Sequence, residues 1–195
     1  MHPVAVGLRI RQEWVWGKCA MRWIILTAFL ALAACTGRPG PTDPLLSTRE
    51  LNLEEFFEGK TVAHGQFQDV FGTVRRRFVV DIDGDWDGKV LTLDENFVYE
   101  DGTTENRKWT LTQTGPDSWQ GSAPGVIGTA TGEERGDTFN WRYRIDLPVP
   151  DGTLRVDFDD WMWLLTEDRL MNIAYMRRAG VTIGQVVIFF EKQER

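Results

Sequence analysis

Apolar and polar residues alternate along most of the chain after position 60, and this alternation predicts one β-strand after another. The clearest segment is 138–147, in which Phe139, Trp141 and Tyr143 share one face and polar residues occupy the other. Gly, Asp and Pro separate such segments, as tight turns require. We predict strands at 61–68, 73–82, 89–99, 104–112, 118–122, 126–131, 138–147, 153–165, 169–177 and 181–192.

These strands are mostly half-buried, and an antiparallel meander of this kind hides its open edges best by closing into a barrel. Two positions depart from the pattern. Glu95 falls on the apolar side of its strand, and the segment 186–190 is apolar on both faces. The outer face of this last strand therefore needs a cover, for which a short helix is the available candidate.

That short helix is predicted between Asn52 and Gly59. Asn52 and Glu55 have the spacing of a capping box, and Leu51 and Phe56 have the spacing of a hydrophobic staple. Its apolar face suits a lid or plug on a sheet.

The start of the chain has the organisation of a secretory signal. After Met21 come a positive charge at Arg22, an apolar run over 23–32 and the small residues Ala33 and Ala34. The run of about a dozen residues is short of the roughly 20 that a membrane helix needs. The charged residues 1–20 precede a complete signal, so translation is expected to begin at Met21; an unusually long charged prefix that starts at Met1 is the alternative.

The last residues of this signal, Leu32 to Cys35, are similar to the lipobox of bacterial lipoproteins. The resemblance implies removal of residues 1–34 and lipid attachment to Cys35, and the absence of Asp after this cysteine favours the outer membrane, facing the periplasm. An ordinary secretory signal that ends in cysteine is the alternative. We expect a flexible tether at 35–50, rich in Gly and Pro, and a single β-barrel domain at 51–195.

Composition narrows the set of partners. The chain has 22 basic and 29 acidic residues, and residues 1–34 hold four of the basic ones but a single acidic one, so the mature domain is strongly acidic. An acidic body is a poor partner for nucleic acid and for an anionic membrane surface. A lipidated Cys35 would leave no thiol for a disulfide.

The region 51–192 resembles a family of proteobacterial lipoproteins known as domain of unknown function 3833. The matching segments are 56–59, 84–88, 97–102, 107–109, 158–162 and 180–190, of which Phe-Asp-Asp-Trp-Met at 158–162 is the most distinctive. The resemblance implies a calycin-like, lipocalin-like barrel. Members are often associated with genes of fatty-acid modification, which makes a lipid or fatty-acyl ligand plausible, but the family carries no established activity or site residues.

Acidic residues form two patterns that could suggest chemistry. The first has the spacing of a calcium loop and consists of Asp83, Asp85, Asp87, Gly88 and Asp94. Strand-like segments flank it where a calcium loop has helices, so we interpret it as an acidic hairpin turn and predict no metal site and no cofactor.

The second pattern lies in the strand 153–165. Asp157 and Asp159 share one face, about 6.6 to 6.8 Å apart, near the lower limit for a carbohydrate-active hydrolase. A solvated strand face is the commoner explanation. Asp160 is in phase with the apolar residues of its strand. If it is buried, its carboxylate needs a charged partner, for which the arginines at 75–77 are candidates, so we predict a structural polar cluster. Its members are Asp159, Asp160, Arg75 and Arg77.

Aromatic residues supply the candidate binding site. Alternation places them on apolar faces, where they either fill the barrel or line a pocket. The candidate lining residues are Phe97, Tyr99, Trp109, Phe139, Trp141 and Tyr143. His64, the single histidine after residue 34, is expected to be structural, and we predict no catalytic residues.

Together these patterns favour a membrane-anchored periplasmic lipoprotein that binds a lipid or other small apolar ligand and is not an enzyme. Its predicted partners are the membrane, through the anchor, and the ligand, without nucleic acid; the oligomeric state stays open. Two alternatives remain, a structural or assembly protein of the envelope with a packed barrel, and a carbohydrate-active hydrolase.

Overall fold

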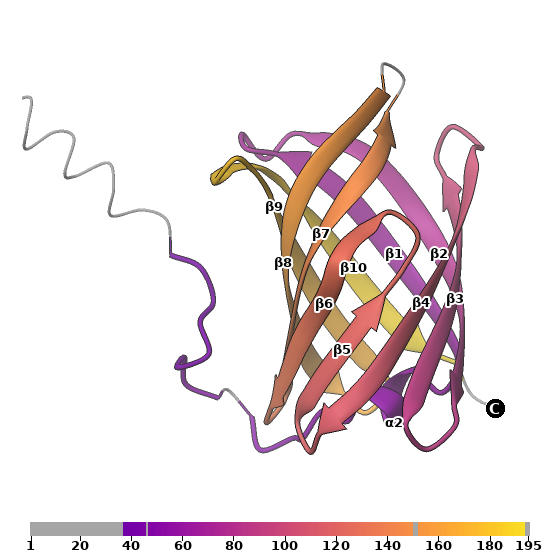
Figure 1. Ribbon diagram of the computed structural model, residues 1–195, viewed down its shortest axis with the longest axis vertical. Helices are drawn as coiled ribbons and strands as arrows, with labels where there is room; N and C mark the ends of the chain where they lie inside the picture. The colour runs from indigo at the N-terminus through magenta and orange to yellow at the C-terminus, as the bar shows by residue number, and fades with distance from the viewer. Residues whose placement is uncertain (1–36, 46, 150–151, 194–195) are drawn as a thin grey trace, which may run out of the picture. The chain divides into compact units, whose positions relative to one another are not determined.

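Ten antiparallel strands and one short helix make up the regular structure of the described residues, 37–45, 47–149 and 152–193, in a computed structural model (Figure 1). The helix is α2 (Leu53–Phe57). The strands are β1 (Gly59–Asp69), β2 (Val74–Trp86), β3 (Val90–Tyr99), β4 (Thr104–Gly115), β5 (Ser118–Ser122), β6 (Val126–Arg135), β7 (Thr138–Val149), β8 (Gly152–Thr166), β9 (Arg169–Arg178) and β10 (Val181–Lys192). Residues Pro41–Arg195 form one compact unit that contains all of these elements.

Each strand pairs with the next along the chain, and the first and last strands close the barrel. The closing contact runs antiparallel from Thr61 opposite Lys192 to Asp69 opposite Gly184. Closure leaves no strand edge open for pairing with another chain. The predicted all-β, up-and-down barrel of about ten strands with one short helix is therefore confirmed.

Most predicted strands agree closely with the observed ones, but β2 and β6 are longer than expected. The prediction ended β2 at Ile82 because Asp83, Gly84 and Asp85 look like turn residues. In the structure Asp83 and Asp85 are exposed, while Gly84 sits against α2. The alternation therefore continues through the acidic segment to Trp86.

The helix α2 plugs one end of the barrel. Its Phe57 ring meets the ring of Phe190 edge-on, with centroids 5.5 Å apart, and Phe56 packs edge-on against Phe57. Leu53, Phe56 and Phe57 are all buried. Apolar side chains of the helix thus complete the core where the barrel would otherwise open to water.

The expectation that this helix covers the outer face of β10 is wrong. Phe190, which contacts the helix, belongs to the inward face of β10, whereas the outward Phe189 remains exposed. A helix of five residues that directly precedes β1 reaches the end of the barrel but not its outer wall.

The predicted capping box also differs from the observed contact. The Asn52 side chain accepts no hydrogen bond from the helix; its Nδ2 donates to Glu55 Oε2 at 3.2 Å. The backbone N–H of Leu53 instead donates to Glu134 Oε1 of β6 at 2.7 Å. A strand side chain therefore caps the helix and ties it to the barrel wall.

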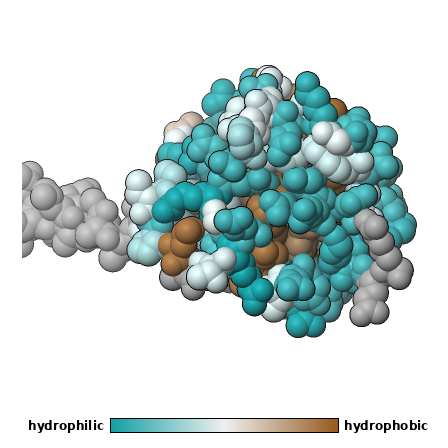
Figure 2. Space-filling model, turned by 90° about the horizontal axis from the view of Figure 1, so that it is seen from below, coloured by the Kyte–Doolittle hydropathy of each residue, from teal (hydrophilic) through white to brown (hydrophobic). Residues whose placement is uncertain are grey.

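The up-and-down topology sorts the turns between two ends. Those after β2, β4, β6 and β8 lie at the end that holds α2, which we call the plug end, and those after β1, β3 and β9 lie at the opposite end, the mouth (Figure 1). The short strand β5 turns back toward β6 before it reaches the mouth (Figure 1). Seen from below, the plug end is mostly hydrophilic, with a small apolar area near its centre (Figure 2). None of the described segments forms a helix long and apolar enough to cross a membrane.

Candidate functional site: a cavity inside the barrel

The barrel encloses a cavity of about 430 Å³. Side chains from α2 and from eight of the strands line it, and the walls are mainly apolar. Leu53 and Phe57 close it at the plug end. Exposed residues of the opposite end, Arg76, Pro148 and Val149, also belong to the lining, so the cavity reaches the surface at the mouth.

The six aromatic residues predicted as candidate pocket lining all face this cavity; they are Phe97, Tyr99, Trp109, Phe139, Trp141 and Tyr143. Trp109 forms the centre of their contacts, edge-on to Trp141 at 5.7 Å and to Tyr143 at 5.1 Å between ring centroids. Tyr143 in turn stacks on Phe158 at 5.1 Å. The rings of Trp109, Trp141, Tyr143 and Phe158 thus form one connected aromatic part of the cavity wall.

Five acidic or basic side chains interrupt the apolar lining: Arg76, Glu95, Glu105, Arg107 and Asp160. Glu95 of β3 and Arg107 of β4 are direct partners in the strand register, and Asp160 of β8 lies across from them. Asp160 is only 7% exposed, and its Oδ1 has no hydrogen-bond partner among the described residues. Buried polar groups without partners are costly, and they mark a place where a polar group of a ligand could bind.

Arg107 is held by a small network. Its Nη2 lies 2.7 Å from Glu105 Oε1, and the Tyr99 hydroxyl donates to Glu105 Oε2 at 2.8 Å. The guanidinium also lies 5.1 Å from the centroid of the Phe97 ring. Burial opposes the ionisation of Glu105, but the charge of Arg107 and the bonds from Arg107 and Tyr99 outweigh it and lower the pKa of that carboxyl.

The other two carboxyls behave in the opposite way. Burial raises the pKa of Glu95 to about 7, with Glu105 and Asp94 adding to the rise and Arg107 opposing it. Burial, followed by the nearby Asp159, raises the pKa of Asp160 well above its ordinary value. Beside the ion pair of Arg107 and Glu105, the lumen therefore holds two carboxyl groups, Glu95 and Asp160, in which burial favours the protonated form.

The predicted structural polar cluster is not formed as expected. Of its members, Asp160 faces the cavity, but Asp159 lies on the outer wall, where it accepts from Asn140 Nδ2 at 2.9 Å. Arg75 pairs with Asp69 at 2.6 Å, and Arg77 occupies an exposed position on the same face of β2. Alternation along β2 and β8 separates these residues onto opposite sides of the barrel wall.

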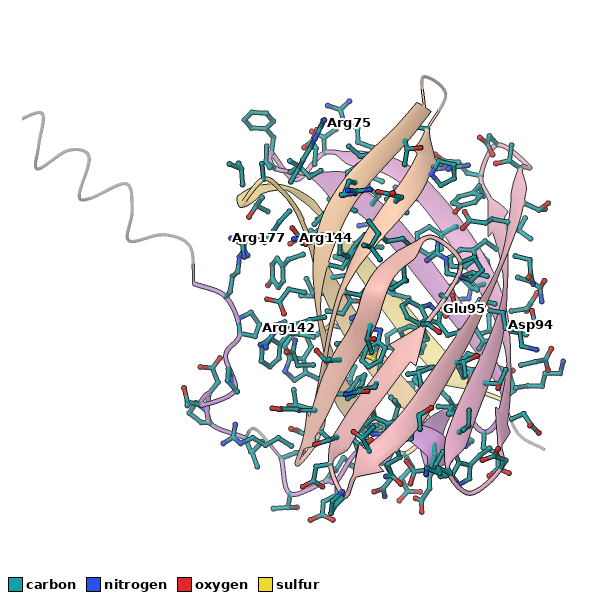
Figure 3. All side chains as sticks on the ribbon, viewed as in Figure 1. Arg75, Asp94, Glu95, Arg142, Arg144 and Arg177 are labelled. Carbon is teal, nitrogen blue, oxygen red and sulfur yellow. The ribbon has the colours of Figure 1, made fainter. Side chains whose placement is uncertain are left out.

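Arg107 is the charged neighbour of Asp160 that the prediction missed. A sequence signal existed, because Arg107 is in phase with Trp109 on a strand whose apolar face was identified. Glu95 carried the same signal on β3, and Figure 3 shows that its neighbour Asp94 points away from the barrel.

The carboxylates considered for hydrolysis lie outside the cavity. Asp157 Oδ1 is 2.7 Å from Arg144 Nε, and Asp159 Oδ1 is 3.3 Å from Arg142 Nε, on the outer wall (Figure 3). An arginine thus neutralises each of them, so this pair does not form a site in a cleft.

The calcium-like segment is the β2–β3 hairpin, as interpreted from the sequence. Asp87 Oδ1 accepts from the backbone N–H groups of Lys89 and Val90, which is turn chemistry. Within the described ranges no three His, Cys, Asp or Glu side chains are placed to hold a metal ion. His64 is exposed on the outer wall, and Cys35 lies outside the described residues, so lipid attachment stays a prediction.

Comparison with solved structures places the fold among calycin-like barrels. The S-type phycobiliprotein lyase CPES from Guillardia theta matches with a TM-score of 0.53 at 10% identity, over 74% of this chain and 94% of the lyase. Rv2717c from M. tuberculosis matches with a TM-score of 0.52 at 16% identity, over 71% of this chain and 93% of that chain. At these identities the similarity concerns the fold alone.

Comparison of the sequence with known proteins and with family models gives two results. The chain matches none of the curated proteins. Residues 29–192 match the family model described as "Protein of unknown function (DUF3833)".

Proposed function

Because the chain belongs to the family of proteins of unknown function DUF3833 and folds as a calycin-like barrel, we propose that it binds a lipid or another small apolar molecule in the lumen. The observation that carries this proposal is the cavity of about 430 Å³ with apolar walls, closed by α2 and reaching the surface at the mouth. Its volume falls within the range of about 300–1,000 Å³ that small-molecule sites occupy.

The walls supply the binding energy. An acyl chain gains about 0.8 kcal/mol for each CH₂ group that it removes from water. Leu93, Trp109 and Leu111 line the deep part of the cavity near α2, and Phe67, Phe158 and Val186 line the part nearer the mouth. A flexible apolar chain therefore finds apolar contacts along the whole depth.

The polar groups between these two regions would orient the bound ligand. Asp160 Oδ1 lacks a partner, and Glu95 and Tyr143 face the cavity beside Arg107. A hydrogen-bonding group on the ligand would satisfy them. We therefore propose an amphiphilic ligand whose polar group lies at Glu95, Arg107 and Asp160.

The proposal includes the location that the sequence indicates. A lipid on Cys35 would anchor the protein to the outer membrane on its periplasmic side, and the segment that follows would act as the tether. The support is the signal organisation before Cys35. We propose binding and not catalysis, since the carboxylates considered for hydrolysis are paired with arginines outside the cavity.

Native mass spectrometry of the unit Pro41–Arg195, purified from bacterial cells without detergent, tests the proposal. We expect a fraction of the protein to carry an added mass that is released on denaturation and extracts into organic solvent. The proposal would be contradicted if the purified protein carries no added mass and takes up no phospholipid or fatty acid on incubation.

A further inference from the structure

Turns at the mouth of the barrel expose their apolar side chains. Phe71 and Val70, in the β1–β2 turn, are 89% and 55% exposed, and Val181, at the start of β10, is 66% exposed. These are the three most exposed large apolar residues in the part of the chain that the structure describes. A phenylalanine at the tip of a turn contributes nothing to the core, so its position points to an interaction outside the protein.

These residues lie together. β1 and β10 are paired, and Asp69 opposite Gly184 is the last pair of their ladder, so the two turns that carry Phe71 and Val181 are neighbours at the mouth. Val149, at the same end on β7, is exposed and also lines the cavity. The apolar tips therefore border the opening through which a ligand would pass.

Arginines accompany the apolar tips. Four exposed arginines lie at the mouth ends of two strands. They are Arg75, Arg76 and Arg77, which follow Val74 at the start of β2, and Arg178, the last residue of β9. Asp69 pairs with Arg75, and Asp101 lies 3.7 Å from Arg76. Arg77 and Arg178 make no ion pair among the described residues and remain available at the rim.

The turns of the plug end are more acidic than the turns of the mouth. The four turns of the plug end, residues 87–89, 116–117, 136–137 and 167–168, contain five acidic residues and one basic residue, whereas the mouth turns 70–73, 100–103 and 179–180 contain two acidic residues and no basic one. The expected repulsion from an anionic surface is therefore stronger at the plug end, and at the mouth the four arginines beside the turns offset the charges of Asp69, Glu100 and Asp101. The mouth presents arginine together with apolar tips, the combination found in proteins that lie on anionic membranes.

We propose that the mouth docks on the surface of an anionic phospholipid bilayer. Val70, Phe71 and Val181 insert at the level of the upper acyl chains, and Arg77 and Arg178 contact lipid phosphate groups. Docking in this orientation brings the opening of the cavity against the bilayer. An apolar ligand could then move between membrane and lumen without crossing water.

Vesicle sedimentation with the soluble unit Pro41–Arg195 tests this inference, because that unit contains the closed barrel and lacks the predicted lipid anchor. The vesicles contain either phosphatidylcholine alone or phosphatidylcholine with phosphatidylglycerol. We expect the wild-type protein to bind the anionic vesicles more strongly. Phe71→Ser should weaken binding about tenfold, as loss of one inserted aromatic side chain requires, and the double variant Arg77→Ser, Arg178→Ser should remove the preference for the anionic lipid.

Leu165→Ser is the matched control, since Leu165 is 44% exposed but lies near the plug end of β8. All these positions are exposed, so the variants should fold, and circular dichroism would confirm it. Failure of the wild-type protein to sediment, or equal binding by the Phe71 and Leu165 variants, would overturn the inference. Uptake of a ligand in solution is measured separately, so this failure is distinguishable from failure of the proposed function.

Discussion

The backbone carbonyl group of Phe57 occupies the space that a β-carbon on Gly84 would need. This contact joins the end of α2 to an inward position of β2, where the barrel wall comes closest to the plug. A glycine is required there because backbone, and not a movable side chain, fills the space.

Gly84→Ala should therefore displace the helix or the strand. We expect the free energy of unfolding to fall by about 3 kcal/mol, as for an overpacked core, and the amide hydrogens of α2 to exchange faster. Gly115→Ala on β4 is the control, because the nearest side-chain atom would lie 3.6 Å from the new methyl group, an ordinary contact. Equal stability of both variants would show that the plug does not depend on this contact.

The carboxylate of Glu134 is the second link between plug and wall. Glu134→Ala leaves the N–H of Leu53 without its acceptor, and we expect a loss of about 1–2 kcal/mol in chemical denaturation. Glu134→Gln keeps an acceptor oxygen and should restore most of that stability. If the glutamine variant is as unstable as the alanine variant, the hydrogen bond is not the stabilising feature.

Strand positions could be predicted from the sequence because most strands have one face inside and one outside. β5 and β10 agree with their predicted ranges to the residue. The plug could be predicted only in part. The apolar face of 53–57 indicated a lid, but its contact with Phe190 inside the barrel depends on closure between β1 and β10, which alternation does not specify.

The polar groups of the cavity could likewise be predicted only in part from the sequence. The phase of Glu95 and of Asp160 on their strands indicated that both point inward. Their electrostatic neighbour, Arg107, lies on β4, far from Asp160 in sequence, and only the curvature of a closed barrel brings β4 and β8 to face each other. Alternation assigns a face to each residue, but it does not say which residues meet across the lumen.

Glu95 makes stability depend on pH. Its pKa is about 7 in the folded protein and near 4.5 in the unfolded chain, so the folded state holds a proton that the unfolded chain releases between these values. The contribution of Glu95 to the free energy of unfolding should therefore fall as the pH rises from 4.5 to 7, by up to about 3 kcal/mol. Glu95→Gln removes the ionisable carboxyl group, so the variant should become more stable relative to the wild type as the pH rises across that window.

The control for this prediction is Asp85→Asn, because Asp85 of β2 is an exposed carboxyl that does not line the cavity. Urea denaturation at pH 4.5, 6 and 7.5 measures the three proteins. Parallel pH profiles for the wild type and the Glu95 variant would mean that the carboxyl ionises as freely in the lumen as in the unfolded chain.

The most direct test of a ligand-binding lumen is to fill it. Val186 of β10 lines the cavity, whereas the next residue, Val187, is also half-buried but points to the outer wall. Titration with N-phenyl-1-naphthylamine, an uncharged apolar dye that fluoresces in apolar surroundings, measures access to the cavity. We predict saturable binding by the wild type and by Val187→Trp, and loss of this binding in a folded Val186→Trp protein. Undiminished binding by Val186→Trp would show that the dye binds outside the cavity and would contradict the proposed ligand-binding lumen.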